Sequence, residues 1–254
     1  MTSPYESVRY RSLEGRSVLI TGGASGIGAA MVEAFSQQGA KVAFLDVDVA
    51  SGTALAERSG ARFVACDLLD IEALRAAVRE VESAQDGVAV LVNNAGKDDR
   101  QSFAEIEPAA WRRLLALNLD HQFFASQAVS AGMAQRGGGS IIMLGSVSWM
   151  RGRPGMAAYT TSKAAINGMT RTLARELGPS GVRVNCIVPG AILTDRQSKL
   201  WLTPEADAEF IALQALKFRL TAEPVARMAL FLGSDESAGC TGANFVVDGG
   251  LTQN

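Results

Sequence analysis

The stretch SVLITGGASGIG, residues 17–28, joins a short apolar run to a glycine-rich loop that opens a helical pattern. The run 17–21 is rich in aliphatic residues and predicts a strand. The glycines of the loop permit a tight turn and a close approach of the backbone to a ligand, while the following helix offers free N–H groups and a partial positive charge. We therefore interpret this stretch as the pyrophosphate-binding turn of a dinucleotide-binding fold. A glycine-rich turn with packing duties only is the alternative.

The same alternation of strand and helix continues along the whole chain. Runs that are apolar at nearly every position are typical of parallel strands buried on both faces. We predict one α/β domain, residues 1–254, built as a single Rossmann-type doubly wound parallel sheet of about seven strands with helices on both faces. Six further runs, bounded by Gly, Asp or Asn, complete the predicted sheet: 41–46, 62–67, 88–94, 140–146, 182–190 and 244–250.

Residues 191–220 form the one long interruption of this pattern. Within it, Thr203 could cap a helix that begins at Pro204. Insertions at the carboxyl edge of such a sheet commonly cover the ligand, so we expect a lid over the substrate. A short helical pair that packs for stability is the alternative.

Composition narrows the classes of partner. Lys and Arg number 24 against 26 Asp and Glu and are scattered, so we expect neither nucleic acid nor an anionic membrane as partner.

The cysteines, the histidine and the apolar runs bear on metals and on the compartment. Cys66, Cys186 and Cys240 are odd in number and lack metal-ligand spacing, which indicates buried thiols in a reducing compartment. The single histidine, His121, argues against a zinc centre and is interpreted as a helix-packing or interface residue. No run reaches the roughly 18 apolar residues needed to cross a bilayer, and the start lacks a secretory apolar core, so we expect a cytoplasmic protein without a metal.

Polar residues follow the predicted strands at the edge where such sheets bind ligands. Asp46 ends the second strand at about the 20-residue offset at which a carboxylate accepts the adenosine ribose hydroxyls, whereas Asp48 falls past the strand end. A carboxylate there repels a 2′-phosphate, so we predict NAD and disfavour NADP. Asp67 closes the third strand and could accept a hydrogen bond from the adenine amine; an aspartate of a surface turn is the alternative. The tetrapeptide NNAG, residues 93–96, offers amides that bridge neighbouring loops and a glycine that admits the nucleotide.

Tyr159 and Lys163 lie four residues apart in a helical pattern and therefore share one face. A free phenol has a pKa of about 10, but a neighbouring ammonium and a cationic nicotinamide would both favour the phenolate. Ser146 ends the fifth strand, where its hydroxyl could hold a substrate oxygen against the phenol. Asn118 is an amide inside a helix and suggests a polar task such as holding a water, with a helix–helix hydrogen bond as the alternative.

Taken with their order and spacing, these motifs resemble the short-chain dehydrogenase/reductase family over essentially the whole chain. The resemblance implies Tyr159 as general base, Ser146 as substrate partner, Lys163 on the nicotinamide ribose, Asn118 in a water-linked proton path, and a homotetramer. The residues that we expect to bind the cofactor are Gly22, Ser25, Gly26, Ile27, Gly28, Asp46, Asp67, Leu68, Asn94, Ala95, Gly96, Tyr159, Lys163, Pro189, Gly190, Ile192 and Thr194.

A narrower similarity concerns the substrate. The segments DDR (98–100), RGGGSII (136–142), GSVSW (145–149), TDRQ (194–197), WLTPE (201–205) and LKFRL (216–220) resemble NAD-dependent aldose 1-dehydrogenases that act on D-xylose or L-arabinose. The resemblance implies oxidation of the C1 hydroxyl of a sugar such as a pentose or galactose to a lactone. It differs at residues 97–101, which read KDDRQ where those enzymes carry NDDRH, and so the charge of that loop is changed.

The side chains that select the sugar are less well marked. Besides Ser146 and Tyr159 we select Trp149, whose indole can stack on a sugar face, and Gln197, whose amide can pair with hydroxyls. A place in the core is the alternative for Trp149. Two other functions stay open. One is a short-chain reductase for another alcohol or ketone, such as a 3-oxoacyl thioester or a polyol. The other is a non-catalytic NAD-binding regulator, which would not need Ser146, Tyr159 and Lys163.

Overall fold

The protein, represented by a computed structural model that describes residues 5, 7–200 and 203–252, folds around one seven-stranded parallel sheet. The strand order is β3-β2-β1-β4-β5-β6-β7, which confirms the predicted fold class. Each predicted apolar run coincides with a strand, although five of the seven strands end earlier than predicted. The strands are β1 Ser17–Thr21, β2 Lys41–Asp46, β3 Arg62–Ala65, β4 Val90–Asn93, β5 Gly139–Leu144, β6 Val182–Pro189 and β7 Asn244–Val247.

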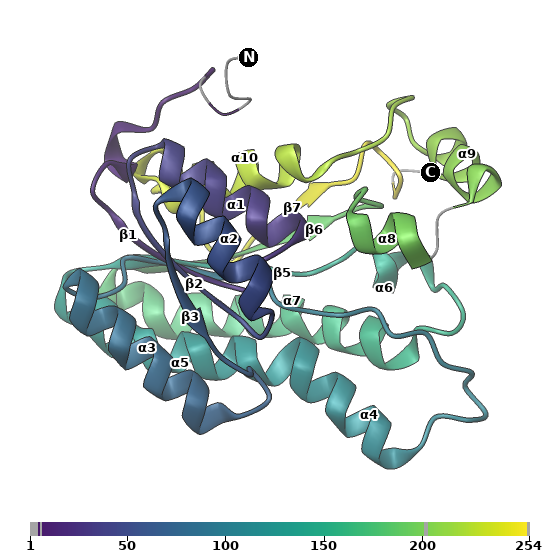
Figure 1. Ribbon diagram of the computed structural model, residues 1–254, viewed down its shortest axis with the longest axis horizontal. Helices are drawn as coiled ribbons and strands as arrows, with labels where there is room; N and C mark the ends of the chain where they lie inside the picture. Colours follow the sequence, from purple (N-terminus) through teal and green to yellow (C-terminus); the bar gives the residue numbers. More distant parts are fainter. Residues whose placement is uncertain (1–4, 6, 201–202, 253–254) are drawn as a thin grey trace.

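Helices cover both faces of the sheet (Figure 1). One layer holds α1 (Gly26–Gln37), α2 (Val49–Ser59) and α10 (Ala222–Gly233), and the opposite layer holds α3 (Ile71–Gln85), α4 (Pro108–Leu115), α5 (His121–Gln135) and α7 (Ala157–Leu177). A π-helical turn, Ala116–Asp120, joins α4 to α5, and α6 (Ser148–Arg151) follows β5. Short 3-10 turns lie at Arg11–Leu13, Gly178–Ser180 and Asp235–Ser237.

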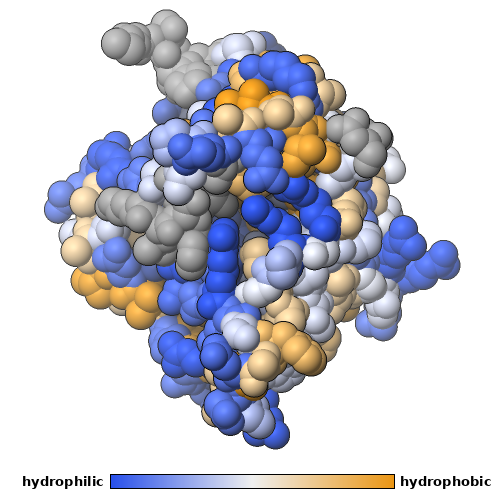
Figure 2. Space-filling view, turned by 90° about the vertical axis from the view of Figure 1, so that its right-hand side faces the viewer, coloured by the Kyte–Doolittle hydropathy of each residue, from blue (hydrophilic) through white to orange (hydrophobic). Residues whose placement is uncertain are grey.

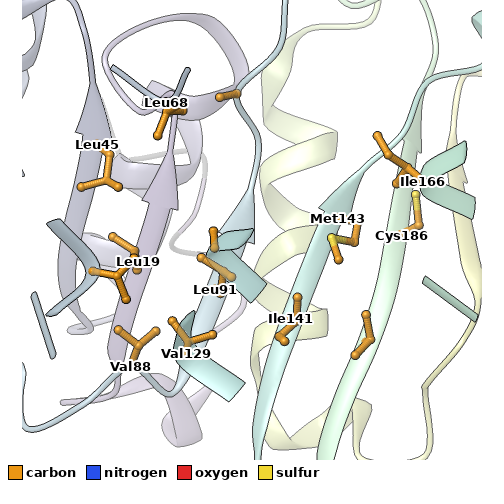
Figure 3. Packing of buried hydrophobic residues seen from close by; sticks show 14 of the residues in the cluster. Leu19, Leu45, Leu68, Val88, Leu91, Val129, Ile141, Met143, Ile166 and Cys186 are labelled. Carbon is orange, nitrogen blue, oxygen red and sulfur yellow. The ribbon is translucent and has the colours of Figure 1, made fainter. Parts of the chain in front are cut away.

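The central strands β1 and β4 are buried at every position because both of their faces are covered, whereas the edge strands β3 and β7 keep exposed residues. The pleat sends alternate residues to opposite sides, so Leu19 and Leu91 join the cluster under α3, α5 and α7, whereas Ile20 and Val92 join the cluster under α1 and α10. Figure 3 shows the first of these clusters. In it, side chains of the strands meet those of the covering helices, the labelled members being Leu19, Leu45, Leu68, Val88, Leu91, Val129, Ile141, Met143, Ile166 and Cys186.

The order of the strands decides where a ligand can bind. The chain runs outward from β1 to β3 and then returns to place β4 on the other side of β1. The loops that leave the carboxyl ends of β1 and β4 therefore diverge to opposite faces and leave a crevice between them, which is where open α/β sheets bind their ligands.

The insertion predicted at residues 191–220 lies beyond this same edge. It contains α8 (Asp195–Leu200) and α9 (Pro204–Leu213), which project from the body of the molecule near α6 (Figure 1). The two ends of the insertion are joined, because the backbone N–H of Leu193 donates to the carbonyl oxygen of Leu220 at 2.8 Å. The helix predicted to begin at Pro204 does so.

Three properties of the described residues bear on partners. None of their helices is both long and apolar enough to cross a membrane. They also contain no group of three or more His, Cys, Asp or Glu side chains placed to hold a metal ion. All three cysteines are free thiols; Cys66 and Cys186 are buried as expected, but Cys240 is only half-buried.

Candidate active site

A cavity of about 880 Å³ opens at the carboxyl ends of the central strands. Every residue predicted to bind a dinucleotide lines it, from Gly22 in the first loop to Thr194 at the start of the insertion. Ser146 and Tyr159 line the same cavity. The crevice thus brings the candidate cofactor residues and the candidate catalytic residues into one space.

The glycine loop is held against the segment that follows β4 by contacts that leave no room for side chains. A Cβ on Gly22, whose φ is +65°, would lie 2.7 Å from Cα of Ala95, and a Cβ on Gly28 would lie 1.9 Å from the carbonyl oxygen of Gly22. The amide nitrogen of Asn94 donates to the carbonyl oxygens of Thr21 (3.1 Å) and Gly22 (2.8 Å). The predicted bridge between neighbouring loops is therefore present.

The first turn of α1 faces the cavity with Ser25, Gly26, Ile27 and Gly28 among the lining residues. Ser25 is the N-cap of this helix, but its side chain makes no capping hydrogen bond. The N–H groups of a helical first turn have no intrahelical acceptor, and together with the helix dipole they favour an anion. The residues present therefore fit the pyrophosphate of a dinucleotide.

The carboxylate of Asp46 lies between this loop and β2. One oxygen accepts from the backbone N–H of Ala24 at 2.9 Å and the other from that of Asp48 at 3.0 Å. Asp48 itself is exposed and caps α2 by accepting from Ser51 N–H at 3.0 Å, and these hydrogen bonds lower its pKa. Asp46 lines the cavity whereas Asp48 does not, so only the first can meet a ribose there.

The candidate catalytic side chains come from β5 and α7. Tyr159 is the third residue of α7, and the Nζ of Lys163, one turn later, lies 5.6 Å from the centre of the Tyr159 ring. Lys163 is 3% exposed and donates to the carbonyl oxygen of Leu144, the last residue of β5, at 2.8 Å. Ser146 follows two residues after this strand, rather than ending it, and its hydroxyl bonds to the phenol of Tyr159.

Electrostatics within the protein run against the expected acidification of the phenol. Burial raises the pKa of Tyr159 to about 12, the Ser146 hydrogen bond works in the opposite direction, and the nearby charge of Asp98 raises it further. Burial also lowers the pKa of Lys163 to about 8. Burial away from water disfavours the charged form of both groups. The two side chains alone therefore do not favour the phenolate of Tyr159.

Asn118 lies behind the cavity rather than on its wall. It is fully buried in the π-helical turn; its Oδ1 accepts from Lys97 N–H at 2.8 Å, and its Nδ2 donates to the carbonyl oxygens of Lys97 (3.1 Å) and Leu114 (2.9 Å). A Cβ on Gly96 would lie 2.9 Å from Oδ1 of Asn118 and 3.2 Å from Nζ of Lys163. Asn118 thereby holds the loop after β4 in place beside the lysine.

His121 lies one turn after Asn118. It is fully buried in α5, which fits the packing role predicted for it. Burial, assisted by the charge of Lys163, lowers the pKa of its imidazole to about 3. This histidine is therefore neutral at physiological pH.

The structure places the two candidate sugar contacts differently. Trp149 is 37% exposed and is not among the described residues that line the cavity. Gln197 belongs to α8, but its side chain lies outside the described part of the structure.

Other side chains, which sequence reasoning missed, line the end of the cavity near α9: Arg151, Arg153, Phe210 and Arg219. The two arginines that flank Gly152 could have drawn notice from their position between Ser146 and Tyr159. Nothing in the sequence connects them to Phe210, more than fifty residues later.

Comparisons with known proteins agree with this geometry. The family described as enoyl-(acyl carrier protein) reductase matches residues 22–252. The chain is 47% identical to D-xylose 1-dehydrogenase of Caulobacter vibrioides (96% of this chain, 98% of that protein) and 45% identical to a protein named probable galactose dehydrogenase GalD of Rhizobium meliloti (99% and 100%). A crystal structure of 3-oxoacyl-[acyl-carrier protein] reductase from Brucella melitensis superposes with a TM-score of 0.90 at 33% identity, covering 99% of this chain and 97% of that one.

Proposed function

Because the chain belongs to the short-chain dehydrogenase/reductase family, we propose that it oxidises the C1 hydroxyl of a cyclic aldose with NAD and forms the sugar lactone. The observation that carries this proposal is the convergence of Ser146, Tyr159 and Lys163 on the cavity whose other end fits a dinucleotide. The 47% identity to a D-xylose 1-dehydrogenase and the 45% identity to a named galactose dehydrogenase support an aldose as the substrate class.

The cofactor is assigned to the residues predicted for it. The first turn of α1 takes the pyrophosphate, Asp46 the adenosine ribose, and Asp67 with Leu68 the adenine, while residues 189–194 take the nicotinamide. When bound, oxidised NAD supplies the hydride acceptor and a positive charge near the phenol. Asp46 supports NAD over NADP, since a 2′-phosphate beside a carboxylate is repelled.

The chain's own residues then handle the proton. The hydroxyl of Ser146 holds the substrate oxygen, and the phenolate of Tyr159 takes the proton from the C1 hydroxyl while the C1–H electron pair leaves as hydride and the C1–O bond becomes a carbonyl. Lys163, held by the carbonyl of Leu144, binds the nicotinamide ribose and keeps a positive charge near Tyr159. Asn118 fixes the loop that carries Gly96 against the lysine.

The phenolate requirement gives a direction of pH dependence. Because burial holds the pKa of Tyr159 at about 12 in the protein alone, only a small fraction of the phenol is ionised at neutral pH. We therefore expect kcat/KM for sugar oxidation to rise with pH above neutrality.

A second candidate is reduction of a 3-oxoacyl thioester or oxidation of a polyol at the same residues. Its thioester form is favoured by the likeness to a 3-oxoacyl-[acyl-carrier protein] reductase at 33% identity. A non-catalytic NAD-binding regulator would have no use for the Ser146–Tyr159 contact.

We also propose that the protein is cytoplasmic and forms a homotetramer. Size-exclusion chromatography with light scattering would test the tetramer.

The experiment is a substrate panel followed by NADH absorbance. Pentoses, hexoses and polyols are offered with NAD and with NADP, and acetoacetyl thioesters are offered with NADH. Turnover of an aldose with NAD, together with a lactone product, supports the proposal. Turnover of only the polyol or the thioester replaces it with the second candidate, and tight NAD binding with no turnover at all revives the regulator.

A further inference from the structure

The end of the cavity near α9 carries a cluster of three arginines on one aromatic ring. The guanidinium carbons of Arg151, Arg153 and Arg219 lie 5.4, 4.9 and 5.3 Å from the centre of the Phe210 ring. Each distance is within the range of a cation–π contact. The ring therefore holds three like charges close together beside the candidate catalytic residues, with which all four side chains share the cavity wall.

The charges of this cluster are unequally matched. Arg219 forms an ion pair with Asp207 at 3.1 Å. Within the described residues, neither Arg151 nor Arg153 has a carboxylate oxygen within 4 Å. The charge of Arg151 is attracted by Glu209 from a longer distance and repelled by the charge of Arg153. Gathering unpaired guanidinium groups is unfavourable unless something negative meets them.

The carboxylates across the cavity are already engaged. Asp98 lies 3.6 Å from Arg196 and 4.0 Å from Arg100, and Asp99 lies 3.1 Å from Arg196 and 3.3 Å from Lys97. Among the described residues, eight Lys or Arg side chains but only five Asp side chains line the cavity. The formal charge of the whole chain is −2, so the positive excess is local. Figure 2 shows the face where α8 and α9 lie: hydrophilic residues run through its middle, and the larger hydrophobic patches lie toward its rim.

We infer that the preferred substrate is an anionic sugar, bearing a carboxylate or a phosphate at the end away from C1, and that Arg151 and Arg153 bind that group. This inference rests on the proposed aldose oxidation, whose substrate class it narrows. Guanidinium groups match both anions with paired hydrogen bonds. Phe210 keeps the two arginines in place, and Gly155, whose carbonyl accepts from Gln101 N–H at 2.9 Å, ties their loop to the segment that follows β4.

The test compares neutral sugars with charged partners of the same ring. D-galactose and D-glucose are measured against D-galacturonate and D-glucuronate, and against the two hexose 6-phosphates, with NAD. The wild-type enzyme is expected to show a KM at least tenfold lower for one anionic set, which also tells the carboxylate from the phosphate. Arg153→Gln is expected to raise that KM at least tenfold and to leave the neutral sugars within about twofold, while Arg153→Lys regains part of the loss.

The matched control is Arg79→Gln, which removes one charge from an exposed site on α3 away from the cavity and is expected to change neither substrate set. Calorimetric titration of the same sugars onto the NAD-loaded protein provides a second readout. Equal use of neutral and charged sugars by the wild type, or equal loss on both in Arg153→Gln, would overturn the inference.

If no aldose is turned over, the proposed function is refuted, and the inference about the anion subsite is tested separately. Calorimetry then still decides the subsite: binding of an anionic sugar that Arg153→Gln abolishes supports it, and absence of such binding refutes it.

Discussion

The two ends of the cavity are built in different ways. At the cofactor end, the contacts come from the backbone and from short side chains: the glycines of the first loop, the start of α1 and the Asn94 bridge. At the substrate end they come from long side chains on separate segments: Arg151 at the end of α6, Arg153 two residues later, and Phe210 on α9. The first end depends on backbone geometry that few residues permit, whereas the second depends on side chains that can be exchanged without moving the sheet.

This difference between the two ends of the cavity indicates where amino-acid substitutions are tolerated. A backbone that lies 1.9 Å from an added Cβ has no way to yield, but an arginine on the surface of a cavity can be replaced while its loop keeps its course. We therefore expect substitutions at the cofactor end to act through binding and folding together, and substitutions at the substrate end to act on substrate choice alone. Four predictions test this division, in decreasing order of their expected effect on turnover.

Tyr159→Phe removes the group that both ends share. The turnover number is expected to fall by about 10³-fold or more, since general acid–base catalysis contributes roughly 10²–10⁴-fold. NAD affinity, measured by calorimetry, should change less than about threefold, because the ring and its packing are retained. Near-normal turnover would remove the phenol from the mechanism, and a parallel loss of NAD affinity would mean that the two ends are not separable at this residue.

Gly28→Ala places a methyl group in the tightly packed glycine loop at the cofactor end. Its new Cβ would meet the carbonyl oxygen of Gly22 at 1.9 Å and Nδ2 of Asn94 at 2.6 Å, so we expect NAD affinity to drop about 100-fold and unfolding free energy to fall by about 1–3 kcal/mol. The matched control is Gly168→Ala in α7, where a Cβ meets nothing within 4 Å. There the helix should gain up to about 1 kcal/mol, as glycine is a poor helix former. Equal behaviour of the two variants in denaturant titrations and NAD binding would contradict the steric account.

Asp46→Ser tests cofactor choice within that end. Loss of the carboxylate removes the repulsion of a 2′-phosphate, so the preference for NAD over NADP, expressed as a ratio of kcat/KM values, should shrink by about ten- to a hundredfold. Asp48→Ala is the control two residues away: it loses the cap of α2 and should lower the melting temperature without altering the preference. A wild-type enzyme that already favours NADP would refute the role of Asp46.

His121→Leu concerns the core beneath both ends and should affect turnover least. The imidazole pKa is about 3 in the folded protein against about 6.5 in an unfolded chain. Between these values the unfolded state binds the extra proton, so wild-type stability should fall as the pH drops below 6.5, by at most about 1.4 kcal/mol per pH unit.

The leucine variant should lack that part of the pH dependence when unfolding is measured at pH 7 and pH 5. Identical slopes for the two proteins would show that His121 is protonated at little cost.

The fold, and the place in the cavity wall of the residues proposed to bind the cofactor, could be predicted because their signals are local. The apolar runs mark the strands, and the loop 21–28, Asp46 and the NNAG segment each follow one strand end, so parallel topology alone assembles them. The predicted strands ran too long where residues such as Asp67 and Ser146 continue past the last ladder pair. Strand ends depend on pairing with neighbours that a single sequence does not display.

The substrate end could not be predicted for the opposite reason. Trp149 was selected for its chemistry, but α6 leaves it exposed and away from the cavity. Phe210 meets the arginines only through the course of the insertion in space, which a single sequence does not display. The sequence also shows the lysine beside Tyr159 but not the burial that raises the pKa of the phenol in the protein alone.

The hydrogen bond between Leu193 and Leu220 has a consequence for how such enzymes diversify. It closes the neck of the segment between them, so that the chain enters and leaves at one point. We expect a segment anchored in this way to tolerate changes of length and sequence between Thr194 and Leu220 without moving the strands, so that the cavity wall formed by α9 can vary while β6 and β7 keep their places.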